Sequence, residues 1–133
     1  MLDIIRDIGA ITRTIQIRSN AEFRPLDLDN NRFIYLIRVC EQPGMFLGAL
    51  ADSIQIDRTT AFRTVKKLVA DGWLRLESDD SDKRLRCVYP TAKAQALYPK
   101  LHAFELAQSE HMLAQLTPAE VKRLAALMTK LQA

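Results

Sequence analysis

Two short helical patterns that lie almost next to each other constrain the fold of this chain more than any other feature. The segment FLGALADSI (46–54) carries its apolar residues on one side of a helix, and a second pattern runs through DRTTAFRTVKKLVADGW (57–73). Asp57 has the chemistry of an N-cap, and Gly72 suits the turn that ends a helix. The connection is therefore only about Gln55 to Asp57, and this spacing predicts a helix-turn-helix.

Directly after the second helix the period of the pattern changes to two. Leu74 and Leu76 alternate with polar residues, and a second alternating run contains Leu85, Cys87 and Tyr89. The polar, turn-rich loop SDDSDKR joins the two runs, which predicts a β-hairpin. A hairpin in this place completes a winged helix-turn-helix. In that arrangement the second helix can lie in the major groove of DNA, and the wing reaches the neighbouring backbone or minor groove.

The N-terminal segments are also predicted to be helical. An apolar stripe predicts a first helix that ends near SNAEFRP, and its members are Ile4, Ile8, Ile11 and Ile15. LDNNRFIYLIRVCEQPG is expected to form a second helix, with Asp29 as its N-cap and Pro43-Gly44 at its end. Phe46 stands where the next helix needs a capping side chain, which a Phe cannot supply.

Two further helices are expected in the C-terminal third. Thr91 can cap a long helix from about 92 to 116, in which Pro99 predicts a kink or a break. The segment TPAE (117–120) supplies Thr at an N-cap, Pro at the first helical position and Glu at the third, the pattern of a capping box. The apolar face of this last helix consists of Val121, Leu124, Leu127, Met128 and Leu131. The predicted fold is mainly α with a small β-hairpin (α+β).

Length and composition suit a folded protein of one domain. The chain has 133 residues, of which 48% are hydrophobic and 26% charged. No apolar run approaches the ~20 residues of a membrane span. The N-terminal MLDIIRDIGAITR lacks the basic start, apolar stretch and cleavage site of a secretory signal, so we expect a cytoplasmic protein. The net charge of +3 favours a polyanionic partner only if the basic residues share one face.

Redox, metal and catalytic functions are less favoured by the sequence. Cys40 and Cys87 lack a metal-ligand spacing and occupy positions typical of small core residues, which leaves a redox-sensing thiol as the alternative. His102 and His111 lie on the predicted long helix, where a structural role is more common than a metal or ligand site. The sequence contains no Gly-rich phosphate loop, G-x-S-x-G or H-E-x-x-H motif. We therefore expect no enzyme activity, no cofactor and no metal.

The candidates for DNA contact lie on the second helix of the helix-turn-helix and on the hairpin. The helix side opposite the apolar stripe contains Arg58, Thr59, Phe62, Arg63 and Lys66. In the hairpin, Lys83, Arg84 and Arg86 would meet phosphate or a narrow minor groove. Asp82 is placed to pair with one of these bases and fix its direction, or to form the turn. The alternative for the helix residues is a solvated face without a partner.

The run LADSIQIDRTTAFRTVKKLVADGWLRLESDDSDKRLRCVYPTAKAQAL resembles the core of the multiple antibiotic resistance regulator (MarR) family. The matching features, in order, are LA-x-x-(I/L), D-R-(S/T)-T, V-x-x-L-x-x-x-G-(W/L), an acidic loop with D-x-R, and T-x-K-(A/G). EQPGMFLGAL before this run and LTPAEVKRL after it also fit, so the resemblance covers about residues 26–133.

The resemblance implies a homodimeric transcription regulator, often a repressor. Residues 28–90 would be the winged helix-turn-helix lobe, and residues 1–24 and 92–133 would form the dimerisation lobe. Many members release DNA when a small, frequently aromatic or anionic ligand binds between these lobes. The operator, the regulated genes, the effector and the direction of regulation do not follow from the sequence.

Carried over by position, the resemblance assigns individual roles. The major-groove candidates are Arg58, Thr59, Thr60, Arg63 and Thr64. Arg84 becomes the wing-tip residue with Asp82 as its support, and Lys66 and Lys67 become phosphate contacts. Three positions depart from the family pattern: Phe46 replaces the usual cap, Gln55 the usual Gly of the turn, and Phe62 a small Ser or Thr. Phe62 could touch a thymine methyl or pack against the wing.

We therefore predict a transcription regulator that binds a pseudo-palindromic operator in double-stranded DNA as a homodimer and responds to a ligand. The alternative is a winged-helix module that binds a protein or a ligand and does not read DNA. Sequence-specific duplex binding that weakens steeply with salt distinguishes the two.

Overall fold

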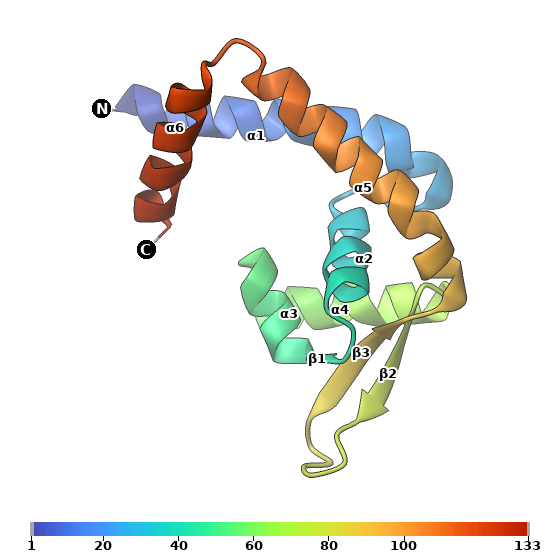
Figure 1. Ribbon diagram of the computed structural model, residues 1–133. Coiled ribbons are helices and arrows are strands. Elements are labelled where there is room, and N and C mark those ends of the chain that lie inside the picture. The colour runs from blue at the N-terminus through green and yellow to red at the C-terminus, as the bar shows by residue number, and fades with distance from the viewer. Residues whose placement is uncertain (1, 133) are drawn as a thin grey trace. The chain divides into compact units, whose positions relative to one another are not determined.

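The computed structural model describes residues 2–132 (Figure 1). These residues fall into two compact units. The first unit ends at Leu101 and contains the helix-turn-helix, the sheet and the core. The second begins at His102 and contains the end of one long helix and a final helix. No helix among residues 2–132 combines the length and the apolar character that a membrane crossing requires.

The chain starts with helix α1 (Leu2–Phe23), continues through a short 3₁₀ helix, η1 (Arg24–Leu26), and enters helix α2 (Arg32–Glu41). The prediction that Asp29 caps α2 is wrong. The N-cap is Asn31, in a left-handed conformation and without a side-chain cap, because the backbone turns through two positive-φ asparagines first. The Asp29 carboxylate instead lies 3.4 Å from Arg24 Nε and 3.7 Å from an Arg32 nitrogen.

Helix α3 (Leu47–Ile54) and helix α4 (Arg58–Ala70) confirm the predicted helix-turn-helix. Phe46 is the N-cap of α3 and gives no side-chain hydrogen bond, as expected. Gln55 ends α3 with φ 60° and ψ 48°, and its N–H donates to the Asp52 carbonyl at 3.1 Å. A non-glycine residue is uncommon in this left-handed region, so the tight turn depends on a strained backbone position.

The predicted hairpin is present as β2 (Leu74–Ser78) and β3 (Arg86–Pro90), and we call these strands and the loop between them the wing. A third strand, β1 (Met45–Phe46), was not predicted, and it pairs antiparallel with β3 to give the order β1-β3-β2. Strand β3 is central and also contacts α2 and α3, and its Cys87 and Val88 are both buried, so the expected alternation does not hold there. Leu85 falls before β3 and remains exposed.

The hydrophobic core of the first unit lies where α2, α3, α4 and the sheet meet. Its largest fully buried apolar side chains are Phe23, Leu28, Leu36, Ile37, Leu50, Leu68, Leu74 and Leu101. The apolar stripe of α4 faces this core, since Ala61, Val65 and Leu68 are all fully buried. The opposite side of α4 is thereby held towards solvent.

Helix α5 (Ala92–Leu113) runs from the first unit into the second, and α6 (Pro118–Leu131) ends the described chain. Thr91 caps α5, because its hydroxyl accepts from the Ala94 N–H at 3.3 Å. Pro99 lies inside α5, and the predicted break does not occur. The capping box is confirmed: Glu120 N–H donates to the Thr117 hydroxyl at 3.2 Å, and Thr117 N–H donates to the Glu120 carboxylate at 2.9 Å.

Candidate nucleic-acid interface

The start of α4 is fixed by its N-cap. The Asp57 carboxylate accepts a hydrogen bond from the Thr60 N–H at 2.8 Å, which satisfies one of the free N–H groups of the first turn. This bond also holds the pKa of Asp57 below its usual value. A carboxylate at a helix N-terminus is stabilised by the helix dipole as well. The first turn of α4 therefore has a defined direction.

One exposed face of α4 carries half of the contact residues predicted on this helix. Its members are Thr59, Phe62, Arg63 and Lys66, which we call the α4 face. These residues line a shallow concavity of roughly 320 Å³. Their spacing of three, four and seven residues from Thr59 places them on one side of a helix. The face is therefore polar and basic, with one aromatic ring in its middle.

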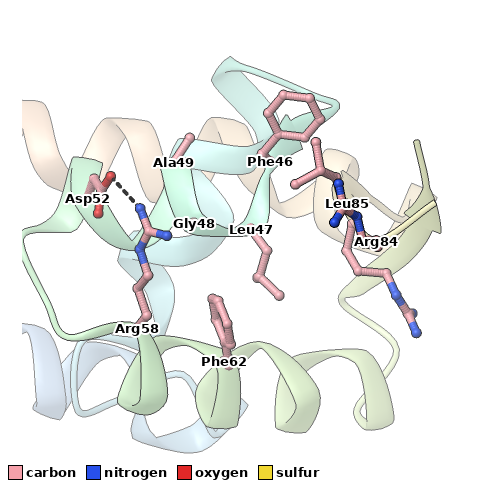
Figure 2. Close-up of a pocket in the computed structure, with 10 residues that line it drawn as sticks. Phe46, Leu47, Gly48, Ala49, Asp52, Arg58, Phe62, Arg84 and Leu85 are labelled. Atoms are coloured by element: carbon pink, nitrogen blue, oxygen red, sulfur yellow. Dashed lines mark hydrogen bonds and ion pairs between the residues drawn. The ribbon is translucent and has the colours of Figure 1, made fainter. Parts of the chain in front are cut away.

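Arg58, the first residue of α4, is held across the turn by α3. Its guanidinium lies 3.1 Å from the Asp52 carboxylate, as the dashed line in Figure 2 shows. The guanidinium also lies close to Gly48. A residue with a Cβ atom at that position would bring this atom within 3.1 Å of the Arg58 guanidinium. Both partners of the ion pair are more than half exposed, so water screens the attraction and the pair contributes little to stability.

Three other predicted residues of α4 are less free to contact a partner. The Lys67 ammonium lies 2.8 Å from the Asp27 carboxylate and 2.9 Å from that of Asp71, and these bonds raise its pKa. Thr60 is half-buried under the N-cap. Thr64 is also half-buried and shares a hydrogen bond with the buried Tyr35, whose pKa is raised by burial. Lys67 serves as a structural link between α4 and the segment before α2.

The acidic residues of the wing fold its loop, residues 79–85. The Asp79 carboxylate accepts from the N–H groups of Ser81 at 3.1 Å and Asp82 at 3.0 Å, and also from the Ser81 hydroxyl. Backbone bonds close the loop, from Asp79 N–H to the Leu85 carbonyl and from Leu85 N–H to the Asp82 carbonyl, both at 3.0 Å. The bond with the Ser81 hydroxyl is the main reason why the pKa of Asp79 lies below its usual value. Asp79 is therefore the residue that shapes the tip.

Asp82 holds Arg84, as its position in the sequence suggested. Its Oδ1 accepts from Arg84 Nε at 3.2 Å and from the Arg84 N–H at 3.0 Å, and its Oδ2 accepts from Arg84 Nη2 at 3.3 Å. This forked contact lowers the pKa of Asp82. The Arg84 side chain is nevertheless 91% exposed, and Lys83 and Arg86 are exposed beside it. The loop thus presents a basic tip that is oriented by one carboxylate.

A groove of roughly 420 Å³ joins the start of α3, α4 and the wing. Figure 2 shows Phe62 pointing from α4 towards Leu47, which points down from α3. The lining residues are Phe46, Leu47, Gly48, Ala49, Asp52, Arg58, Phe62, Arg84, Leu85 and Arg86. The groove therefore has apolar walls, and arginines from both α4 and the wing line it. Sequence reasoning did not find the part of Gly48, Asp52 and Leu85 in it, because their role depends on how α3 and the wing approach α4.

The two thiols and the two imidazoles are not among the residues that line the groove or the α4 face. Burial raises the pKa of both Cys40 and Cys87, which disfavours the reactive thiolate that a redox sensor needs. His102 and His111 are exposed on α5. Within residues 2–132 no three His, Cys, Asp or Glu side chains are grouped as a metal site would require.

A model of the MarR family matches residues 26–85 of the chain. These residues begin at the end of η1 and run through the helix-turn-helix to the tip of the wing. The chain is also 36% identical over 132 residues to the uncharacterized HTH-type transcriptional regulator YybA of Bacillus subtilis (strain 168). That alignment covers 99% of this chain and 88% of the relative.

Solved structures of transcription regulators have the same fold as this chain. A structure of the transcriptional regulator SlyA superposes with a TM-score of 0.93 at 35% identity, over 98% of this chain and 92% of that one. A Listeria monocytogenes protein assigned to the MarR family of transcriptional regulators, solved in complex with a 26mer DNA, superposes with a TM-score of 0.93 at 37% identity. The second match covers 99% of this chain and 88% of the other.

Proposed function

Because this chain belongs to the MarR family of transcription regulators, we propose that its α4 face and its wing together bind specific sites in double-stranded DNA. The observation that carries the proposal is that arginines of α4 and of the wing line one groove, beside the exposed and polar α4 face. A polyanion can contact the basic side chains of α4 and those of the wing at the same time. The related Listeria protein that was solved with a 26mer DNA supports the choice of duplex DNA as the polyanion.

The surroundings of each residue suggest a division of roles. Thr59 and Arg63 lie on the exposed α4 face, where a helix in the major groove meets base edges. Arg58 sits at the helix start and can exchange Asp52 for a DNA phosphate. The proposed phosphate contacts are Lys66, Lys83 and Arg86, with Arg84 as the wing-tip residue for the minor groove. Lys67, which is bound by two carboxylates, is left out of the interface.

The proposal includes a homodimer. Large apolar side chains remain exposed along α1 and α6, and a second copy is the simplest way to cover them. Residues 1–24 and 92–133 would supply this contact, and residues 28–90 the DNA-binding lobe. Two lobes related by a two-fold axis would bind half-sites about 10 base pairs apart on a pseudo-palindromic operator.

We further propose a ligand-responsive repressor that acts in the cytoplasm. A small aromatic or anionic effector would act by binding one of two states of the dimer more tightly, which shifts the equilibrium away from the DNA-bound state. The family consists of transcription regulators rather than enzymes, and the proposal includes no catalytic activity.

The experiment that tests the proposal is in vitro selection of random duplex DNA by the purified protein, with the molecular mass of the complex measured alongside. We expect enrichment of a pseudo-palindrome with half-sites one helical turn apart, bound by a dimer with an affinity that falls steeply with salt. If no sequence is enriched and binding at physiological salt is absent or purely non-specific, the DNA-reading assignment fails. The winged-helix module that binds a protein or ligand would then replace it.

A further inference from the structure

Phe62 is an aromatic residue in the middle of a surface that is otherwise polar and basic. It is the fifth residue of α4, and its side chain remains 37% exposed. The ring lines both concavities, the groove that also contains Leu47 and the shallower one that contains Arg63 and Lys66. It therefore forms the ridge between the two, within the surface proposed to face DNA.

Only one side of the Phe62 ring packs against an apolar side chain of the protein. Figure 2 shows the ring directed towards Leu47, so part of its apolar surface faces the groove wall. On the other side its neighbours in the second concavity are Thr59, Arg63 and Lys66, whose polar ends favour water or an anion. A Phe that served only to brace the wing would be covered by it, and more than a third of this residue is open to solvent.

Major-groove chemistry offers one apolar partner for such a ring. The edges of the bases present hydrogen-bond donors and acceptors, and the C5-methyl group of thymine is the apolar exception. Phe62 lies three residues after Thr59 and four before Lys66 on the α4 face, so a helix that brings Thr59 to base edges brings Phe62 as well. A Phe ring cannot hydrogen-bond to the other edges, so dehydrating them against it is unfavourable.

We propose that Phe62 contacts the C5-methyl group of a thymine in each half-site and so selects T·A at that position. This inference rests on the proposed DNA-binding function and names a specificity-determining residue within it. The favourable term is the apolar surface that the methyl group and the ring remove from water. Burial of a single carbon group the size of this methyl changes the affinity by about four-fold.

Deoxyuridine substitution tests the contact directly, because uracil differs from thymine only by the missing methyl group. The selected operator is prepared with each thymine replaced in turn, and binding is measured for the wild type and for Phe62→Ala. We expect one symmetric pair of positions at which the wild type loses about four-fold in affinity per half-site. The Phe62→Ala protein should bind the thymine and uracil versions of that position equally.

Two comparison variants separate the contact from general damage. Phe62→Leu keeps an apolar side chain and should retain part of the preference for thymine. Arg63→Ala should bind more weakly but keep the full sensitivity to uracil, because its partner is a different atom. Thermal unfolding of Phe62→Ala is measured to establish that the variant is folded.

Two outcomes would overturn the inference alone. One is that the wild type fails to discriminate uracil from thymine at every position, and the other is that Phe62→Ala keeps the same discrimination as the wild type. Either result leaves the proposed function intact, because specific binding of the wild type to the operator is still observed. Failure of the wild type to bind any specific site would overturn the proposed function together with this inference.

Discussion

Arg63 and Arg84 are both exposed bases of the proposed interface, but their surroundings give them different tasks. Arg63 lies on the α4 face, and Arg84 is held at the wing tip by Asp82. We expect Arg63→Ala to lose about 1–3 kcal/mol of discrimination between the operator and a mismatched site. Arg84→Ala should instead weaken binding to all duplexes and flatten the dependence of affinity on salt.

The measurement is a salt titration of affinity for operator and random duplex with each variant. Lys67→Ala provides the comparison, because Lys67 is bound by Asp27 and Asp71 and is expected to affect stability more than the salt slope. Equal and sequence-independent losses for Arg63→Ala and Arg84→Ala would contradict the division between a base-reading contact of Arg63 and a sequence-independent contact of Arg84 at the wing tip.

Gln55 is a second residue whose conformation has a measurable consequence. Its φ of 60° is unfavourable for any residue that has a Cβ atom, whereas glycine adopts this conformation without strain. We expect Gln55→Gly to raise the free energy of unfolding by up to about 1 kcal/mol, partly offset by the greater freedom of glycine in the unfolded chain. Chemical denaturation measures this change, and Gln55→Ala, which retains the strain, should leave stability nearly unchanged. A loss of stability in Gln55→Gly would show that the Gln55 side chain stabilises the turn.

Sequence reasoning was most successful for residues whose role is set by their own helix or turn. The cap at Asp57 and the support of Arg84 by Asp82 involve residues two or three apart, and both contacts are present. Lys67 was assigned to phosphate by its position in the family pattern, and that assignment stays a prediction. In the structure its ammonium also bonds to Asp27, forty residues away in the chain, and no periodicity reveals such a contact.

At the scale of elements, the wing shows why a short loop carries acids before its bases. Asp79 folds the tip by accepting from Ser81 and Asp82, and Asp82 orients Arg84. Hydrogen bonds hold the pKa of both carboxyls below the usual 3.8. A lowered pKa in the folded state means that the contribution to stability is present above the unfolded value and is lost as pH falls through the folded one.

We therefore expect the wing loop to stay equally ordered from neutral pH down to about pH 3.8, the pKa of the carboxyl in the unfolded chain. At lower pH the order of the loop should be lost. Amide hydrogen exchange and the NMR shifts of the Ser81 and Asp82 N–H groups follow this transition. In Asp79→Ala these two amides should already be unprotected at neutral pH, while the strand amides of β3 remain protected. A loop transition with its midpoint above 3.8 would contradict the lowered pKa.

The strands show where local patterns cease to determine an element. The hairpin was predictable because its two runs alternate and are joined by a polar loop. Strand β1 has only two residues, Met45 and Phe46, which is too short for any period to appear. It pairs with the edge of β3, and the helices α2 and α3 also contact that strand, in which Cys87 and Val88 are both buried. The missed cap of α2 has a similar cause, because Asp29 bonds to arginines on either side of the turn.

At the scale of the whole molecule, the apolar surface that the chain leaves exposed is concentrated on its terminal helices. The exposed members on α1 are Leu2, Ile4, Ile5, Ile11, Ile15 and Ile17, and those on α6 are Leu124, Leu127, Met128 and Leu131. No residue of α6 is buried, although a capping box defines its start. An amphipathic helix of this kind derives most of its stability from packing against a partner, so α6 is expected to need one.

The dimer proposal therefore makes a specific prediction about Leu127, which is 45% exposed on the apolar face of α6. Leu127→Asp should shift the protein towards monomer, because a charge would have to be buried in the interface. Ala126→Asp introduces the same charge on the opposite side of the helix and should leave the dimer intact. Sedimentation equilibrium measures the association.

Operator affinity should fall in parallel for Leu127→Asp alone, since a monomer engages one half-site and loses the effective concentration that links the two. Unchanged association of Leu127→Asp would place the dimer contact on another surface and remove α6 from it.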